Sequence, residues 1–356
     1  MLYEILKTSY EYKIGIEALL VAALVFALTV LAGKIIIPVL SAKKANQPIN
    51  SYVAEHAGKA GTPTMGGICF IIASLAVLLV WALLEASGVI GNNSRAGDLI
   101  PLGLTLCLGV GNAMIGFVDD YQKLIKKNNE GLSEKQKLIL QVVIAAAYIA
   151  MMAITNNLPT ALHIPFTSIH LELSYLAYPA YLLVIVGFVN STNITDGLDG
   201  LASSVGVASS LGIVLMSIAS ASLYFTLTPI GYRYDAVVAA SLLGALLGFL
   251  VFNHYPAKVF MGDTGSLYIG GIIMGLAISS GEFVAVVLMG FVYVLDMLSS
   301  LIQRLYFKAT HGKRIFKKAP VHHHFQLCNW TENKIVTVFF ITSAIFTLIG
   351  VLGAII

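Results

Sequence analysis

Long apolar segments alternate with short polar ones along the whole chain. The apolar segments occupy residues 16–40, 66–90, 99–118, 138–155, 174–191, 200–226, 236–252, 266–280, 283–303 and 335–356. Most of them reach the roughly 20 residues that a helix needs to cross a bilayer. A lone strand in lipid would leave its backbone groups unpaired, so the segments are predicted to be helices. The pattern therefore predicts an all-α, polytopic membrane protein with about ten transmembrane helices.

Composition agrees with this fold class. Of the 356 residues, 58% are hydrophobic and 11% are charged, whereas an average soluble domain has about 25% charged residues. The first 17 residues lack the continuous apolar stretch of a cleavable signal, and we expect a short interfacial helix there. Residues 1–356 are expected to form one integral membrane domain, with 304–334 as a basic loop. The three cysteines have neither disulfide-framework nor metal-site spacing.

Basic residues predict the orientation of the chain. Seventeen of the 21 lysine and arginine residues fall in the loops after the first, third, fifth, seventh and ninth apolar segments. The other four are Lys7, Lys13, Arg95 and Arg233. Because cytoplasmic loops carry an excess of Lys and Arg, the positive-inside rule predicts that those five loops are cytoplasmic and both termini lie outside.

The polar segments are distributed as unevenly as the basic residues. Five polar segments belong to the predicted cytoplasmic side, namely 41–65, 119–137, 190–200, 253–266 and 304–334. A transporter needs polar groups near the middle of the membrane to pass a solute. The gathering of polar groups at one face favours an active site in a cytoplasmic cleft over a proton-coupled transport pathway. A lipid-phosphate-binding scaffold without catalysis would not need this many carboxylates.

Five aspartates mark the candidate site. Asp119 and Asp120 end the third apolar segment, Asp196 and Asp199 are spaced to share one face of a helical turn, and Asp263 lies between Gly262 and Thr264. Helix N-capping is an alternative for Asp196 and for Asp263, but it does not explain the adjacent pair. Carboxylates without thiolates suit a hard cation such as Mg²⁺, which in proteins usually accompanies phosphates.

Lysines and glycines near these acids fit a phosphate ligand. Lys59, Lys123 and Lys137 are close to the acids in sequence, although lysines here also serve as topology markers or lipid contacts. The segments TPTMGG and FMGDTGS precede apolar segments, so their backbone N–H groups could face phosphate oxygens at helix N-termini.

The sequence His322-His323-His324 follows Pro320 in the basic loop. Neighbouring side chains point apart in regular structure, so a shared zinc ion is the weaker alternative. Hydrogen bonding or proton donation to an anionic substrate is favoured. Asp296, inside the ninth apolar segment, is a candidate functional acid by position, but we expect it to pair with Arg304 or a neighbouring helix.

The motifs TPTMGG, GFVDDYQK, NSTNITDGLDGLA, FNHYPAKVFMGDTGSL and RIFKKAPVHHHF, spread from Thr62 to His324, strongly resemble those of the phospho-N-acetylmuramoyl-pentapeptide transferases. These enzymes are a branch of the polyprenyl-phosphate N-acetylhexosamine-1-phosphate transferases. The resemblance implies transfer of phospho-N-acetylmuramoyl-pentapeptide from its UDP conjugate to undecaprenyl phosphate. It also implies lipid I and UMP as products, an Mg²⁺ requirement, a homodimer in the bacterial plasma membrane and no nucleic-acid partner. The nearest alternative is a sister enzyme that uses UDP-N-acetylglucosamine.

The resemblance also implies residue roles. Asp263 corresponds to the Mg²⁺ ligand, and Asp119 and Asp120 to the catalytic pair, with Lys123 beside them. His322 is assigned to catalysis and, with His323 and His324, to diphosphate or sugar contacts. The uridine pocket is expected to contain Lys59, Asn253, Gln303 and Phe260, with Phe260 stacking on the base. The remaining substrate contacts are expected from Thr64, Lys137, Asn193, Asp196 and Asp199, with Lys135 as the rival of Lys137.

Overall fold

The computed structural model describes residues 2–42, 61–90, 99–126, 131–223 and 229–356. The helices in the first half are α1 (Leu2–Ala42), α2 (Gly67–Ala86), α3 (Ile100–Lys126), α4 (Glu134–Ile154), α5 (Ala177–Thr195) and α6 (Leu201–Leu223). Those in the second half are α7 (Pro229–Asn253), α8 (Gly262–Ser279), α9 (Phe283–Met289), α10 (Phe291–Ala309), α11 (Val321–Gln326) and α12 (Glu332–Ile355). A small hairpin of β1 (Ala161–His163) and β2 (His170–Glu172) precedes α5.

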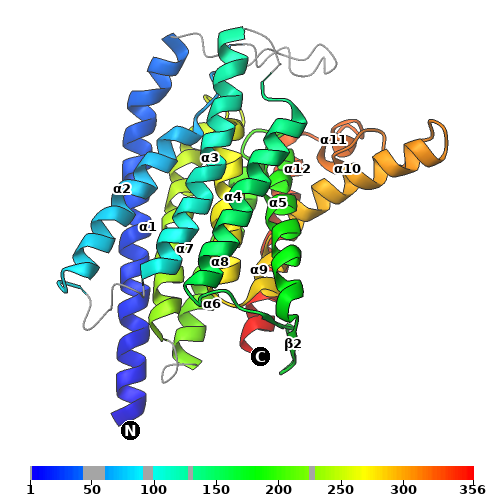
Figure 1. Ribbon diagram of the computed structural model, residues 1–356. Helices are drawn as coiled ribbons and strands as arrows, with labels where there is room; N and C mark the ends of the chain where they lie inside the picture. Colours follow the sequence, from blue (N-terminus) through cyan, green and yellow to red (C-terminus); the bar gives the residue numbers. More distant parts are fainter. Residues whose placement is uncertain (1, 43–60, 91–98, 127–130, 224–228) are drawn as a thin grey trace.

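The prediction of an all-α, polytopic membrane protein is confirmed. In the described residues, eight helices are long and apolar enough to cross a membrane, and α9 with α10 makes a ninth if the bent pair is one span. The predicted apolar segments coincide with one α-helix each, except 283–303, which forms α9 and α10; α8, with 18 residues, corresponds to segment 266–280. Both chain ends lie at the same end of the helix bundle (Figure 1).

Two details of the prediction were wrong. The first residues do not form a separate interfacial helix, because the helix that starts at Leu2 continues without a break into the first span. The apolar segment 283–303 is not one straight helix, since the chain bends by 76° between α9 and α10 at Gly290. Beyond the bend, α10 projects sideways from the bundle (Figure 1). A bend of this kind needs a local break in the helical hydrogen-bond ladder, for which glycine is a common cause.

Helix α8 is the centre of the bundle. Every residue from Thr264 to Ile278 is buried, and the helix packs against α3 along much of its length. Small residues permit this approach: a Cβ on Gly116 of α3 would collide with the carbonyl group of Asp263, and a Cβ on Gly67 of α2 would collide with the backbone of Gly265. Helices in lipid associate through such close van der Waals packing.

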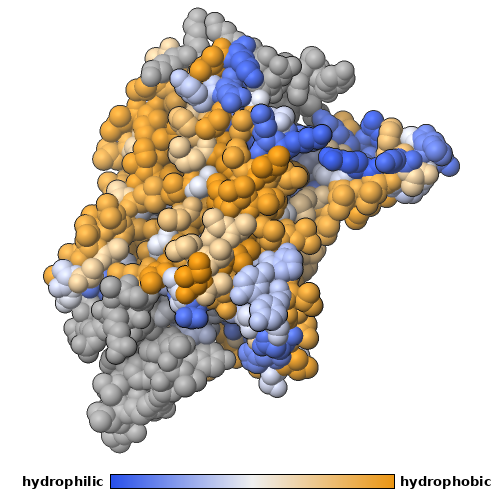
Figure 2. Space-filling model, in the orientation of Figure 1, coloured by the Kyte–Doolittle hydropathy of each residue, from blue (hydrophilic) through white to orange (hydrophobic). Residues whose placement is uncertain are grey.

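The outer surface of the bundle is largely apolar. Figure 2 shows hydrophobic side chains covering the visible sides of the helices. The projecting helix α10 is amphipathic, with a hydrophobic lower face and a hydrophilic upper face in this view. Its exposed apolar residues include Leu298, Leu301, Ile302, Leu305 and Phe307. An apolar exterior is the expected match to lipid, and an amphipathic helix suits the membrane surface.

Two charged contacts lie away from the five polar segments. Arg233 of α7 makes bidentate contacts with Glu17 of α1 and Glu85 of α2 at 2.7–3.0 Å, and these contacts join three helices.

In the hairpin, the two ring nitrogens of His163 lie 2.8 Å from the Glu282 carboxylate and from the Thr167 carbonyl oxygen. Burial opposes a charge on His163, but these two contacts outweigh it and raise the pKa of the imidazole.

Candidate active site

Asp120 caps a neighbouring helix. Its side chain is buried and accepts hydrogen bonds from the N–H groups of Asp263 and Thr264, at 3.2 and 3.0 Å, and from the Thr264 hydroxyl at 2.7 Å. These donors belong to the first turn of α8, where backbone N–H groups have no partner inside the helix and the dipole favours a negative charge. The alternative that Asp263 caps its own helix was therefore wrong, because the cap comes from Asp120 of α3.

Asp119 and Asp263 share two lysines. Lys123 Nζ lies 2.5 Å from Asp119 and 3.3 Å from Asp263. Lys137 Nζ, from α4, lies 2.5 Å from Asp263 and 3.4 Å from Asp119. The Leu132 N–H donates to the other Asp119 oxygen at 2.8 Å. Two ammonium groups therefore compensate two carboxylates that would otherwise repel each other. Lys135 is exposed, so the structure favours Lys137 over its rival.

The end of α5 supplies the third side of the site. Asn193 donates to Asp263 at 2.7 Å and to Ser266 at 2.9 Å. Asp196 follows the last residue of α5, and burial together with the nearby charges of Asp263, Asp120 and Asp199 holds the pKa of its carboxyl well above the usual range. Asp199 accepts from the N–H of Ala257 at 2.9 Å. Asp196 and Asp199 lie in a turn, so the expectation that one helical face carries both was wrong.

A metal ion could be held by three of these acids. One oxygen from each of Asp119, Asp120 and Asp263 lies within 4.8 Å of the others. An all-carboxylate set of oxygen donors suits Mg²⁺, which prefers hard ligands and retains several waters. The donor set therefore fits the expected ion. Both oxygens of Asp120 accept hydrogen bonds from α8, whereas Asp119 and Asp263 each present an oxygen to the two lysines.

The N–H groups of the two glycine segments have other hydrogen-bond partners than expected. The Gly66 and Gly67 N–H groups donate to the carbonyl oxygens of Phe260 and Met261, at 2.9 and 3.0 Å. The N–H groups at the start of α8 donate to Asp120. The prediction that these N–H groups face phosphate was therefore wrong, because the two segments bind each other and the Asp120 carboxylate. Gly262 takes φ +74°, which a residue with a side chain rarely adopts.

The expected uridine residues come from different segments of the chain. Asn253 is buried, donates to the Val259 carbonyl oxygen and accepts from the Ser203 hydroxyl, both at 3.0 Å. The Phe260 N–H donates to the carbonyl oxygen of Pro63, which precedes the buried Thr64. Gln303 lies on α10, where it binds the backbone of residues 315 and 316. Lys59 lies outside the described residues.

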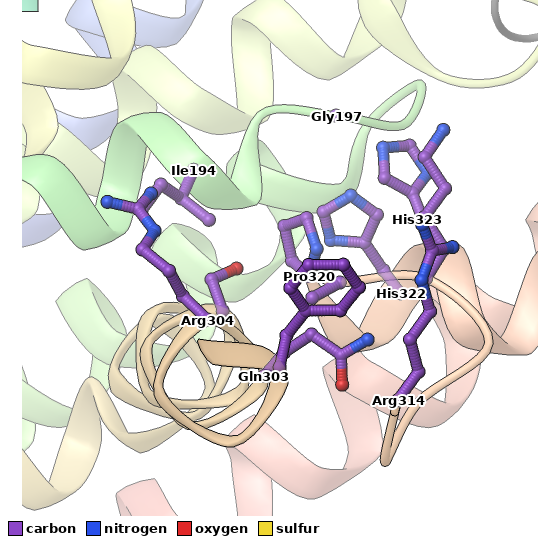
Figure 3. A pocket seen from close by; sticks show the side chains of 12 residues that line it. Ile194, Gly197, Gln303, Arg304, Arg314, Pro320, His322 and His323 are labelled. Atoms are coloured by element: carbon purple, nitrogen blue, oxygen red, sulfur yellow. The ribbon is translucent and has the colours of Figure 1, made fainter. Parts of the chain in front are cut away.

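A cavity of about 640 Å³ adjoins the turn that carries Asp196. It contacts Ile194 and Gly197 from the end of α5 and the following turn, and α10 and the segment after it provide the opposite wall (Figure 3). The cationic side chains that line it are Arg304, Arg314 and Lys318, and the imidazoles are those of His322 and His323. A cavity with this lining is suited to an anionic ligand.

The three histidines have separate partners. His322 is fully buried and its Nδ1 lies 2.9 Å from an Asp296 oxygen. His323 Nδ1 lies 2.6 Å from the Gln326 side-chain oxygen, and His324 Nδ1 accepts from the Lys317 N–H at 3.1 Å. The rings of His322 and His323 pack edge to face, 4.3 Å between their centroids, but each of the three Nδ1 atoms contacts a different partner. The expectation that Asp296 pairs with Arg304 or a neighbouring helix is confirmed in its second alternative, since the partner is His322 from the short helix α11.

Sequence reasoning missed several contacts of the site. Thr264, the Leu132 N–H and the Asp296–His322 pair carry no local pattern that identifies them. Thr264 adjoins the named Asp263, so an N-cap partner for that helix could have been sought. The other contacts join residues 13 and 26 positions apart, and only the packing of the helices brings them together.

Comparison with known proteins gives three consistent results. The sequence model of glycosyl transferase family 4 matches residues 102–281, and a phospho-N-acetylmuramoyl-pentapeptide-transferase signature matches residues 59–71. The chain is 40% identical over 335 residues to a protein of that name from Staphylococcus saprophyticus, covering 93% of this chain and 97% of the relative. It is 40% identical over 336 residues to the one from Desulfitobacterium hafniense, covering 94% and 96%. The Staphylococcus carnosus relative is 39% identical over 332 residues, covering 92% and 97%.

Proposed function

The chain belongs to the phospho-N-acetylmuramoyl-pentapeptide-transferase family, and from this premise we propose its reaction and its site. The protein transfers phospho-N-acetylmuramoyl-pentapeptide from UDP-N-acetylmuramoyl-pentapeptide to undecaprenyl phosphate. The products are lipid I and UMP, and the step is the first membrane reaction of peptidoglycan synthesis. The observation that carries the assignment of the site is the meeting of Asp119, Asp263, Lys123 and Lys137 from three helices.

The acids provide a place for Mg²⁺. We assign Asp263 as the principal ligand, with Asp119 and Asp120 completing the carboxylate set. When bound there, the ion would neutralise charge on the diphosphate of the donor. Asn193 holds one Asp263 oxygen and Lys137 approaches the other, so the ligand is oriented before any substrate arrives.

The lysines position phosphate groups. A phosphate of the donor brings negative charge close to Asp119 and Asp263, and Lys123 and Lys137 are placed to balance it. The lipid phosphate oxygen attacks the phosphorus attached to the sugar, and the bond from that phosphorus to the bridging oxygen breaks. UMP leaves with the bridging oxygen. Catalysis of this kind rests mainly on positioning and charge stabilisation.

We favour direct attack over a covalent intermediate. A phosphate monoester has a second pKa of about 6, so it is already largely dianionic at pH 7 and needs little help from a base. Asp119 then acts as a base or as a group that orients the lipid phosphate. The alternative is an aspartyl phosphate formed by double displacement. A phosphorylated Asp119 or Asp120 trapped in a single turnover would exclude direct attack.

The membrane setting is part of the proposal. We place the protein in the bacterial plasma membrane with the site facing the cytoplasm. The reason is that the Lys and Arg residues are concentrated in the loops that carry the site, and such loops are cytoplasmic by the positive-inside rule. Both substrates are then within reach, the nucleotide from the cytoplasm and the polyprenyl phosphate from the bilayer. We also expect a homodimer, as in the family that the motifs resemble.

Release of UMP tests the proposed reaction. Purified protein in detergent with undecaprenyl phosphate and Mg²⁺ should release UMP from UDP-N-acetylmuramoyl-pentapeptide and label the lipid with the sugar. UDP-N-acetylglucosamine is the matched control donor. Turnover of that control at the higher rate would identify the chain as the sister enzyme, and turnover of neither donor would contradict the proposal.

Asp263→Asn tests the metal assignment separately. The variant should lose Mg²⁺-dependent UMP release while keeping the wild-type elution profile and melting temperature. It should also lose the thermal stabilisation that Mg²⁺ gives the wild type, a readout that does not depend on turnover. Normal activity in this variant would remove Asp263 from the metal site.

A further inference from the structure

The Asp296–His322 pair is buried at the side of the cavity. Both side chains have no exposed surface, and their contact spans 2.9 Å between Oδ2 of Asp296 and Nδ1 of His322. Asp296 belongs to α10, five residues after the start of that helix, and His322 belongs to α11. The second Asp296 oxygen lies 3.4 Å from the backbone N–H of His322. The carboxylate therefore contacts two donors of one residue.

This contact fixes the tautomer of the imidazole. Because Nδ1 faces a carboxylate, Nδ1 carries the hydrogen and donates it. The other nitrogen, Nε2, is buried and has no hydrogen-bond partner in the part of the chain that the structure describes. A buried polar atom without a partner is costly and is uncommon unless a ligand or a water completes it.

Nε2 is directed at the turn beside the carboxylates. A Cβ built on Gly197 would collide with this nitrogen, so only a residue without a side chain leaves room there. Gly197 and His322 both line the cavity, and they face each other in Figure 3. Gly197 follows Asp196, so the free nitrogen lies where the cavity meets the turn that carries the acids.

We propose that Asp296 is a positioning residue for the transfer reaction, which holds Nδ1–H of His322 and so directs Nε2 toward an anionic group of the donor substrate. The carboxylate also compensates a second proton on the ring, so that Nε2–H can donate to that group. The proposal rests on the proposed function and on the role of His322 in it. Asp296 itself does not reach the substrate.

The charges around His322 agree with an anionic ligand. Asp296 is the acid in direct contact with the ring, and the His323 ring lies 4.3 Å from it, centroid to centroid. The other charged groups that face the cavity or adjoin Gly197 are Arg304 from α10, Arg314 and Lys318 from the segment before α11, and Asp196 from the turn after α5. Three cations thus line the cavity that His322 borders.

The chain offers a matched control. The Ser299 hydroxyl donates to the Asp296 carbonyl oxygen and accepts from the Val321 N–H at 2.9 Å, so it also ties α10 to α11. Ser299→Ala breaks this tie without touching the imidazole. Any purely structural consequence of loosening α11 should appear in both variants, whereas an effect on the protonation of the ring should appear only at Asp296.

The test compares Asp296→Asn, Asp296→Glu and Ser299→Ala by UMP release. The asparagine variant should lower kcat/KM for the UDP donor about 10- to 100-fold, as expected for loss of an orienting partner, without changing KM for undecaprenyl phosphate. Because an uncompensated ring loses its proton more easily, the alkaline limb of its kcat/KM profile should move to lower pH. Asp296→Glu should restore part of the activity and the wild-type profile, and Ser299→Ala should keep that profile.

Four outcomes would overturn the inference. A folded Asp296→Asn protein with wild-type kcat/KM and pH profile would do so, and so would an equal shift of the profile in Ser299→Ala. If the Asp296→Asn variant does not fold, ¹⁵N-histidine NMR spectra of the wild type test the tautomer of His322 instead. The signals of His322 are assigned by their loss in His322→Gln. A hydrogen on Nε2 and none on Nδ1 would contradict the proposal. Full activity of His322→Gln would remove its premise, whereas absence of UMP release in the wild type would contradict the proposed function itself.

Discussion

At the scale of single residues, two adjacent aspartates have different surroundings. Asp119 lies against Lys123 and Lys137, while Asp120 points into the first turn of α8. Successive side chains on a helix are about 100° apart, so one faces the lysines and the other faces the neighbouring helix. This division explains how two adjacent acids are tolerated at the end of an apolar helix.

The lysine assignment gives a residue-scale prediction. Lys137→Ala should lower the rate of UMP release about 100-fold, because Asp119 and Asp263 lose one of their two shared cations and the donor phosphates lose a positioning charge. Lys135→Ala, on the exposed side of the same helix turn, is the control and should stay within about twofold of the wild type. Equal activity of the two variants would contradict the assignment of Lys137.

His163 gives a prediction for pH. Its pKa in the folded protein is raised above the value of about 6.5 expected for an unfolded chain, so the contact with Glu282 contributes fully below that pH. The contribution is lost as pH rises through the folded-state pKa. The melting temperature in detergent should therefore fall as pH rises above about 6.5, and His163→Gln should reduce the fall. His254→Gln, at an exposed histidine, serves as control and should leave it unchanged.

At the scale of elements, α8 positions the site because α3 approaches it closely. Gly262 starts the helix and Gly275 lies 13 positions later, and a Cβ at either of these glycines would meet a neighbouring helix or its side chains. The approach brings the end of α3 against the start of α8, which places Asp120 on the helix terminus and Asp119 beside Asp263. Packing density, rather than local sequence, therefore sets the carboxylate geometry.

Glycine substitutions in α3 test this dependence. Gly116→Ala should destabilise the protein by about 1–3 kcal/mol through overpacking and should lower kcat, because the added methyl group pushes the Asp263 carbonyl away from α3. Gly103→Ala, in the same helix with open space around it, should be neutral or stabilise by up to about 1 kcal/mol. Melting temperature and UMP release measure both effects. A harmless Gly116→Ala would show that α3 and α8 do not need this contact.

At the scale of the whole molecule, function follows from asymmetry between the two ends of the bundle. The acids, the lysines and the cavity lie near the ends of α3, α5 and α7 and the starts of α4 and α8. The chain termini lie at the opposite end (Figure 1). A site at one surface, fed from the bilayer and from the aqueous phase, suits a reaction between a lipid and a nucleotide.

The orientation can be measured directly. In a background with Cys69, Cys107 and Cys328 replaced, a membrane-impermeant maleimide should label Tyr175→Cys in intact cells but not Lys313→Cys. Tyr175 is 86% exposed, close to the hairpin, whereas Lys313 lies in the basic segment after α10. Opening the membrane should make Lys313→Cys reactive. Labelling of Lys313→Cys in intact cells would place the site outside and contradict the orientation.

The sequence alone determined the fold class, the helical segments, the uneven distribution of charge and the identity of the acids. These follow from hydrophobicity, segment length and motif, which are local properties of the chain. Only the tertiary structure decided that Asp120 caps α8, that Lys137 rather than Lys135 reaches the acids, that the glycine segments bind each other and that Asp296 holds His322. Each of these depends on how closely two helices pack and how they are rotated, and no local pattern encodes that relation.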